Sequence, residues 1–202
     1  MTSKPNYIKA LHKLTRANPQ IAHLEDLERE LFAPGNDRAT AIMFGSFVEE
    51  SLRLLLLSAM RSNLNSDDKN RIFEFDGAAG SFSSRIIVAW AFNLIGPITR
   101  FNLDVIRLLR NEFAHSRMPL DFETNEVRDV CSRITIVELP GSHIPFRYLE
   151  RLSQNERLKA EELENPKTRF ITACHLISYR MHQKIHGPQA GDIAFPGDVL
   201  LP

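Results

Sequence analysis

The sequence predicts an all-α helical bundle of about six to eight helices. Two observations beyond residue spacing support this fold class. Asn18-Pro19 and Asn165-Pro166 each place a capping side chain directly before a proline, which is typical of a helix start. Gly96-Pro97 is typical of a helix end that turns into the next helix. Apolar residues recur at helical spacing in four segments: residues 21–31, 42–57, 106–113 and 170–185.

Composition indicates an ordinary globular protein that is not built for unassisted DNA binding. The 25 Lys and Arg residues balance 25 Asp and Glu residues, so the chain has no overall basic charge for duplex DNA. Cys131 and Cys174 lack metal-ligand spacing and are expected to be reduced, buried thiols. The N-terminus lacks the apolar core of a signal peptide, and Leu54–Leu57 is too short to span a bilayer. We therefore expect a cytoplasmic protein with no membrane contact and no cofactor.

Three regions are expected along the chain: a packing helix within residues 1–35, a helical bundle domain over 36–186, and an irregular tail over 187–202. The helix over 37–60 is the most apolar and should be central. The helix over 82–95 should be nearly buried, including Ile87, Trp90 and Phe92. Residues 134–139 fit either a short edge strand or a helix end, and 148–163 read as a charged surface stretch. The expected caps and helices are Asn36 for 37–60, Ser66 for 67–73, Ser81 for 82–95 and Thr124 for 125–134, with further helices over 98–115 and 167–186.

The segment Asn102–Ser116 (NLDVIRLLRNEFAHS) carries the densest group of polar side chains. Ile106, Leu109 and Phe113 form one apolar stripe that should face the core. On roughly the opposite side, the spacing from Asp104 through Arg107 and Asn111 to His115 makes consecutive members neighbours. Arg110 lies about 140° from His115 on a straight helix, so the two could act together only if the helix distorts or a second chain contributes.

A polar stripe interrupts the apolar helix over 37–60 at Ser46, Glu49, Glu50 and Arg53. One interpretation is a partly exposed helix edge stabilised by a Glu49–Arg53 ion pair. In the other, Glu49 or Glu50 faces the group formed by Arg107, Arg110 and His115 and fixes its geometry.

Two weaker motifs leave alternatives open. Gly77, Gly80 and Ser81 form a glycine-rich turn before a helix, which could bind an anion through free backbone N–H groups or serve close packing. No P-loop Lys-Ser/Thr follows. His182 and His186 lie one helical turn apart on a face shared with His175 and Tyr179. No carboxylate ligand accompanies them, so we expect a solvated or interface face and no metal.

Three motifs follow one another over residues 40–116: an acidic, leucine-rich helix (SFVEESLRLLLL), an Asp-Gly-x-x-Gly turn into a helix (DGAAGSFSSRI), and a helix ending in Arg-x4-His (RNEFAHS). Their order resembles the mannitol-operon repressor (MltR-like) family. The last motif is also similar to the HEPN (higher eukaryotes and prokaryotes nucleotide-binding) superfamily, whose RNases pair two chains around such an element. The resemblance implies a HEPN-like bundle, a homodimer, and catalytic roles for Arg110, Asn111 and His115 if the chain is an RNase.

Two functional hypotheses follow from these features. The first is a transcriptional regulatory module that acts as a homodimer through a protein partner, because no helix-turn-helix with a polar recognition helix is evident. The second is a metal-independent endoribonuclease with RNA as substrate. There His115 would be the general acid or base, Arg110 would stabilise phosphate charge, and Asn111 would orient either. In a third, degenerate variant, Arg110 and Asn111 only brace helices.

Overall fold

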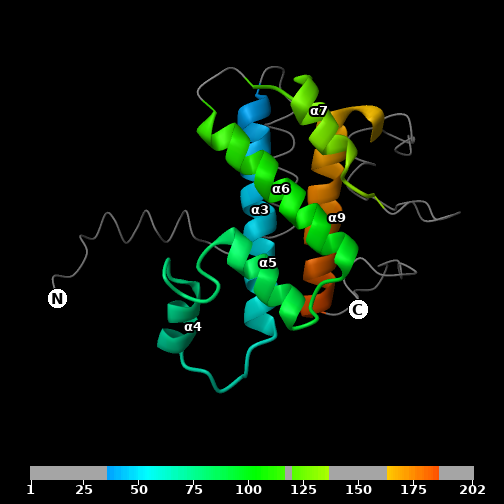
Figure 1. The fold of residues 1–202 in the computed structure, drawn as a ribbon. Coiled ribbons are helices and arrows are strands. Elements are labelled where there is room, and N and C mark those ends of the chain that lie inside the picture. The colour runs from blue at the N-terminus through cyan, green and yellow to red at the C-terminus, as the bar shows by residue number, and fades with distance from the viewer. Residues whose placement is uncertain (1–35, 117–119, 137–162, 187–202) are drawn as a thin grey trace, which may run out of the picture.

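The computed structural model describes residues 36–116, 120–136 and 163–186, and these residues form an all-α bundle (Figure 1). The expected fold class is confirmed. Three expected segments lie outside the described residues: the helix near residues 19–33, positions 148–162 of the charged stretch, and the tail 187–202. The helices are α3 (Asp37–Ser58), α4 (Ser66–Phe73), α5 (Phe82–Ala91), α6 (Pro97–His115), α7 (Asn125–Ser132) and α9 (Pro166–His186).

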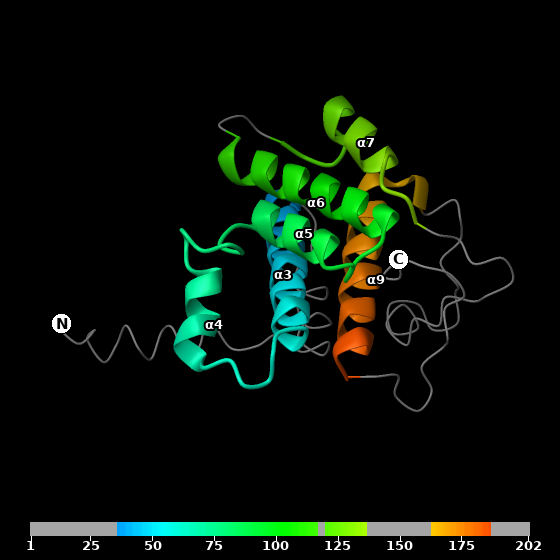
Figure 2. The same cartoon turned by 60° about the horizontal axis from the view of Figure 1, so that its bottom comes forward.

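The centre of the fold is the pair α3 and α9, which lie side by side and are crossed by α6 (Figures 1 and 2). Ile106, Leu109 and Phe113 of α6 are fully or almost fully buried, as their spacing predicted. Burying one such side chain stabilises a fold by about 1.5–3 kcal/mol. The predicted central position of α3 is also confirmed, since ten of its 22 residues are buried and they extend from Thr40 to Leu56. On α9, Phe170, Cys174, Ile177 and Met181 are buried as well.

Asp37 connects the start of α3 to the rest of the bundle. Its carboxylate accepts a hydrogen bond from the backbone N–H of Phe122, at 2.9 Å, and one from Lys167 Nζ, at 2.8 Å. Beside it, Arg38 Nη1 donates to the carbonyl of Ser116 just after α6, at 3.1 Å. These three contacts hold the start of α3 against the end of α6, the segment before α7 and the start of α9.

Helix capping follows the prediction at two starts and departs from it at three. Ser81 caps α5 in a reciprocal capping box with Ser84, and Asn165 Oδ1 accepts from Thr168 N, at 2.9 Å. The predicted cap Ser66 is wrong, whereas Asn36 and Thr124 occupy the predicted N-cap positions without the expected side-chain bond. Asn36 and Thr124 make no side-chain cap bond, the Thr124 hydroxyl being bonded to Asp121, and α4 is capped one residue earlier, where Asn65 accepts from Asp68 N.

Helix α5 ends four residues before the predicted Ile95. Asn93 adopts a left-handed conformation with φ 57°, and its N–H donates to the carbonyl of Trp90 at 3.0 Å. The N–H of Leu94 donates to the carbonyl of Ala89 at 2.9 Å. This pair of bonds is a Schellman motif, which terminates a helix where a residue such as asparagine tolerates the left-handed region.

The expectation that this helix is nearly buried is wrong for its outer face. Phe82, Ile86 and Ala89 are buried, whereas Ile87, Trp90 and Phe92 are exposed. Helix α5 packs one face against α3 and α6, so the apolar side chains on its other face remain exposed, and Trp90 contacts the Arg100 guanidinium there.

Several smaller expectations are also settled. Cys131 and Cys174 are free and buried, and burial raises the pKa of Cys131 to about 12. The described residues 134–136 form neither strand nor helix, and 137–139 lie outside the described part. Helix α7 ends at Ser132 rather than at Ile134. In the described ranges, no helix combines the length and apolar character needed to cross a membrane.

Candidate functional site

Glu49 lies at the junction of α3, α5 and α6 and binds an arginine from each of the other two helices. Its Oε2 accepts from Arg110 Nη2 at 3.1 Å, and its Oε1 accepts from Arg85 Nη1 at 3.2 Å. Sequence reasoning anticipated that Glu49 or Glu50 would face the arginines of the α6 segment, and for Glu49 and Arg110 this is confirmed. We call Glu49, Arg85 and Arg110 the arginine hub.

Arg85 was not anticipated from the sequence. Its Nε donates to the carbonyl of Ala79 at 2.9 Å, and its guanidinium carbon lies 5.7 Å from the centroid of the Phe73 ring. Burial lowers the pKa of Arg85 from its ordinary value, and the charge of Glu49 opposes that shift. A signal was present, because Arg85 is the single charged residue between Phe82 and Ile95. A lone charge in an apolar helix needs a partner.

Arg110 reaches Glu49 because α3 has a glycine opposite it. A Cβ built on Gly45 would lie 2.7 Å from both Cβ and Cγ of Arg110, closer than real Cβ contacts allow. The Arg110 stem therefore packs directly on the α3 backbone. At its other end Nη1 donates to Oδ1 of Asn111 at 3.0 Å. A glycine in the middle of a buried helix is the signal that could have indicated this close approach.

The predicted ion pair between Glu49 and Arg53 is wrong in its acidic partner. Arg53 pairs with Glu50 instead, with Nη2 2.6 Å from Oε1 and Nε 2.8 Å from both carboxylate oxygens. Glu49 is turned inward to the two arginines of the hub, which leaves Glu50 as the acceptor one turn from Arg53. The Arg53 guanidinium also lies over the Phe73 ring, 5.7 Å from its centroid.

His115 does not join Arg110 and Asn111. It is the last residue of α6 and is exposed, and the helix is regular up to it, with Ser116 N donating to Glu112 O at 2.9 Å. The helix distortion that would bring Arg110 and His115 together is therefore absent from α6. On the outer side, Arg107 and Asp104 form a loose pair at 3.4 Å.

The turn at Gly77 and Gly80 is explained by close packing. A Cβ on Gly77 would lie 2.2 Å from the carbonyl oxygen of Arg71, and a Cβ on Gly80 would lie 2.1 Å from that of Glu74. Ser81 Oγ accepts from the backbone N–H of Ser84 at 3.1 Å, so one of the N–H groups that an anion would use is already bonded. Of the two interpretations, the geometry favours the packing one.

The histidines of α9 were expected on a solvated or interface face, and His175 departs from this expectation because it lies in the core. His175 is buried, with its ring centroid 5.4 Å from that of Phe44, and burial lowers its pKa to about 3. His182 and His186 stack with ring centroids 5.7 Å apart, and burial followed by the neighbouring His186 lowers the pKa of His182. Within the described ranges, no three His, Cys, Asp or Glu side chains gather as a metal ion would need.

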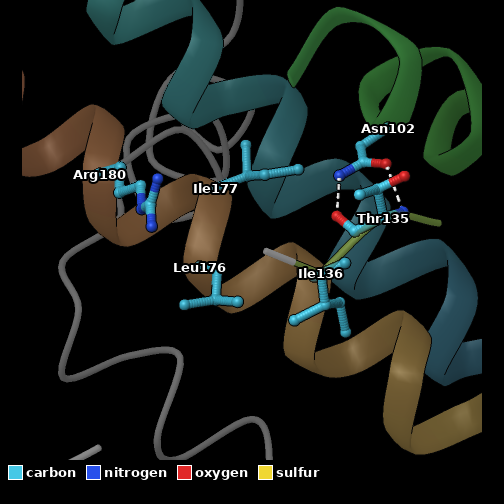
Figure 3. A pocket seen from close by; sticks show the side chains of 7 residues that line it. Asn102, Thr135, Ile136, Leu176, Ile177 and Arg180 are labelled. Carbon is cyan, nitrogen blue, oxygen red and sulfur yellow. Dashed lines mark hydrogen bonds between the residues drawn. The ribbon is translucent and has the colours of Figure 1, made fainter. Parts of the chain in front are cut away.

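A small pocket lies between α6, α9 and residues 135–136 (Figure 3). At its wall the buried side chain of Asn102 donates to the carbonyl of Thr135 at 2.8 Å and accepts from its N–H at 3.0 Å (Figure 3). The Asn102 amide thus pairs with both backbone groups of Thr135, as a neighbouring strand would, and holds the segment after α7 in place. Both of its polar atoms are engaged, so it serves structure rather than a ligand. Ile136, Leu176, Ile177 and Arg180 line the rest.

These observations define an all-α bundle in which the arginine hub connects α3 to α5 and α6. No family model and no curated protein sequence matches the chain. Among solved structures, a chain of the MtlR–HPr complex from Escherichia coli matches with a TM-score of 0.56 and 16% sequence identity, over 79% of this chain and 98% of that chain. The protein therefore has an MtlR-like fold.

Proposed function

We propose that the chain is a regulatory module that acts through a protein partner of the HPr kind and works as a homodimer without its own DNA-reading element. One observation carries this proposal: the fold matches MtlR, a protein whose structure was solved in complex with HPr. The resemblance of residues 40–116 to mannitol-operon repressors supports the regulatory role. The balance of 25 basic against 25 acidic residues is consistent with recognition of a protein rather than nucleic acid.

The state of Arg110 supports this function over ribonuclease chemistry. A phosphate-stabilising arginine must offer its guanidinium donors to the substrate. Glu49 and Asn111 instead occupy donors of Arg110 on both Nη atoms. His115, the expected acid or base, lies elsewhere on the helix. We infer that Arg110 and Asn111 brace helices, as in the degenerate variant of the HEPN hypothesis.

The experiment that tests the function is a calorimetric titration of the purified full-length chain with purified HPr from the same organism. An unrelated protein of similar size serves as the control titrant. We expect a saturable heat with a dissociation constant in the micromolar range or tighter, typical of transient regulatory complexes. Equal heats for HPr and the control at about 100 µM would contradict the HPr-type partner.

A further inference from the structure

The outer sides of helices α5 and α6 carry large exposed apolar side chains. Ile87 is 57% exposed, Trp90 37%, Phe101 47% and Leu108 44%. On α6 the positions of Phe101, Asp104 and Leu108 fall within about 60° of one another, on the side away from the buried stripe. The two helices pack against each other and lie together at the front of the bundle in Figure 1. We call this surface the α5–α6 face.

The α5–α6 face has the size and composition of an interface core. Its four apolar side chains leave roughly 400 Å² exposed, which is the size of the largest apolar patch on a typical monomer, a patch that is often functional. A standard interface covers about 800 Å² on each partner, with an apolar centre and a charged rim. Arg100, Asp104 and Arg107 add charges of both signs to this face, and the Arg100 guanidinium lies 5.1 Å from the Trp90 ring centroid.

We propose that a second copy of this chain covers the α5–α6 face through a two-fold axis that passes between the two α6 helices, at the height of the point between Asp104 and Val105. Phe101 and Leu108 lie at equal distances on either side of that point. When two such helices pack antiparallel about the axis, Phe101 of one copy stands at the height of the partner's Leu108. A two-fold interface requires this kind of self-complementary spacing.

The charges of the face are self-complementary in the same arrangement. At a rise of about 1.5 Å per residue, Asp104 of one copy lies about 3 Å along the helix axis from the partner's Arg107. Each interface would therefore contain two such pairs. Within one chain Asp104 and Arg107 form only a loose contact of 3.4 Å, and both side chains remain partly exposed. A face made for a strongly acidic or strongly basic partner would carry one sign of charge, whereas this face carries both.

This arrangement deepens the proposed function, on whose homodimer it rests, and it has a consequence for the HEPN resemblance. The two His115 residues would lie at opposite ends of the helix pair, about 30 Å apart along the axis. The dimer would therefore not join two Arg-x4-His elements in one cleft. The interface serves assembly of the module, and the ribonuclease arrangement of two chains would be excluded.

The test is a charge exchange between copies, followed by sedimentation analysis of the full chain. Asp104→Arg alone places like charges opposite each other at both pairs of the dimer, and so does Arg107→Asp alone. We expect the dimer dissociation constant of each variant to be at least tenfold higher than that of the wild type. An equimolar mixture restores both attractive pairs between unlike chains, so the mixture should regain the wild-type dimer mass. Circular dichroism confirms that both variants are folded.

Rescue by mixing cannot arise from the pair within one chain, because each variant breaks that pair. A mixture that stays monomeric, or a wild-type chain that is monomeric at 100 µM, would overturn the proposal. As a second measurement, Asp104→Cys beside the axis should form a disulfide-linked dimer on mild oxidation. Glu112→Cys, exposed on the same helix but about 11 Å from the axis, should not. The HPr titration is read separately, so a monomer that binds HPr would refute this face and the homodimer, and would leave the HPr-type partner of the proposed function intact.

Discussion

Removal of the Glu49 charge should lower the free energy of unfolding more than removal of the Glu50 charge does. The Glu49 side chain is 17% exposed, and it holds Arg85 and Arg110, which are 11% and 29% exposed. Glu49→Gln keeps the shape but leaves two guanidinium groups facing a neutral amide. Charged hydrogen bonds contribute about 1.5–3 kcal/mol each where buried, and loss of one buried partner costs about 3–5 kcal/mol. Because water reaches the arginine hub in part, we expect a loss of about 2–3 kcal/mol.

The matched control is Glu50→Gln, one residue along the same helix. Glu50, 31% exposed, makes an ion pair with Arg53, 25% exposed, and such surface pairs contribute about 0–1 kcal/mol. Urea unfolding followed by circular dichroism measures both variants. If Glu49→Gln lowers the unfolding free energy no more than Glu50→Gln does, the reasoning about the arginine hub is refuted.

A double-mutant cycle separates the contact between Glu49 and Arg110 from other effects of the two substitutions. The variants Glu49→Gln, Arg110→Gln and their combination give the coupling free energy directly. We expect about 1–2 kcal/mol, since the two groups make one charge-assisted hydrogen bond at 3.1 Å. A coupling free energy near zero would mean that the contact is incidental to the packing of α3 on α6.

Three further outcomes are expected. Gly45→Ala should lower the unfolding free energy by about 1–3 kcal/mol in urea unfolding, because its Cβ would overlap Arg110; Ser46→Ala is the control. Folded His175 has its pKa lowered to about 3 from 6.5, so the unfolded chain binds the extra proton and stability falls as pH drops below 6.5. Its share of the loss between pH 7.5 and 5.5 is about 1.4 kcal/mol and should vanish in His175→Gln. Finally, purified wild type and His115→Ala should leave single-stranded RNA equally intact on a denaturing gel; cleavage lost only in the variant would support the ribonuclease.

The fold class and the long helices could be predicted from the sequence because each has a strong apolar period. The spacing of Ile106, Leu109 and Phe113 places all three on one face of a helix, and that face is buried in the structure. Helix ends were less predictable, since they depend on single backbone bonds. Asn93 illustrates this point: nothing in its apolar surroundings distinguishes a continuing helix from one closed by a Schellman motif.

The arginine hub was predictable only in part, because its residues lie far apart in the sequence. Glu49 and Arg110 are 61 residues apart, and the polar stripe on an apolar helix indicated that Glu49 had an internal partner. Arg85 and Gly45 supply the rest of the geometry from helix crossings that periodicity does not encode. The burial of α5 was overpredicted because apolar content alone does not say which face meets a neighbour.

The arginine hub and the α5–α6 face are structurally connected. A bundle that recognises partners with the outer sides of α5 and α6 must keep those helices fixed on α3, or the apolar face would rearrange at little cost. The bonds from Glu49 to Arg85 and Arg110 provide that restraint, since each crosses from α3 to one of the two helices. Glu49→Gln should therefore weaken self-association as well as stability, even though Glu49 lies outside the α5–α6 face. Unchanged dimer dissociation in a folded Glu49→Gln variant would separate the two features and show that the face is held by packing alone.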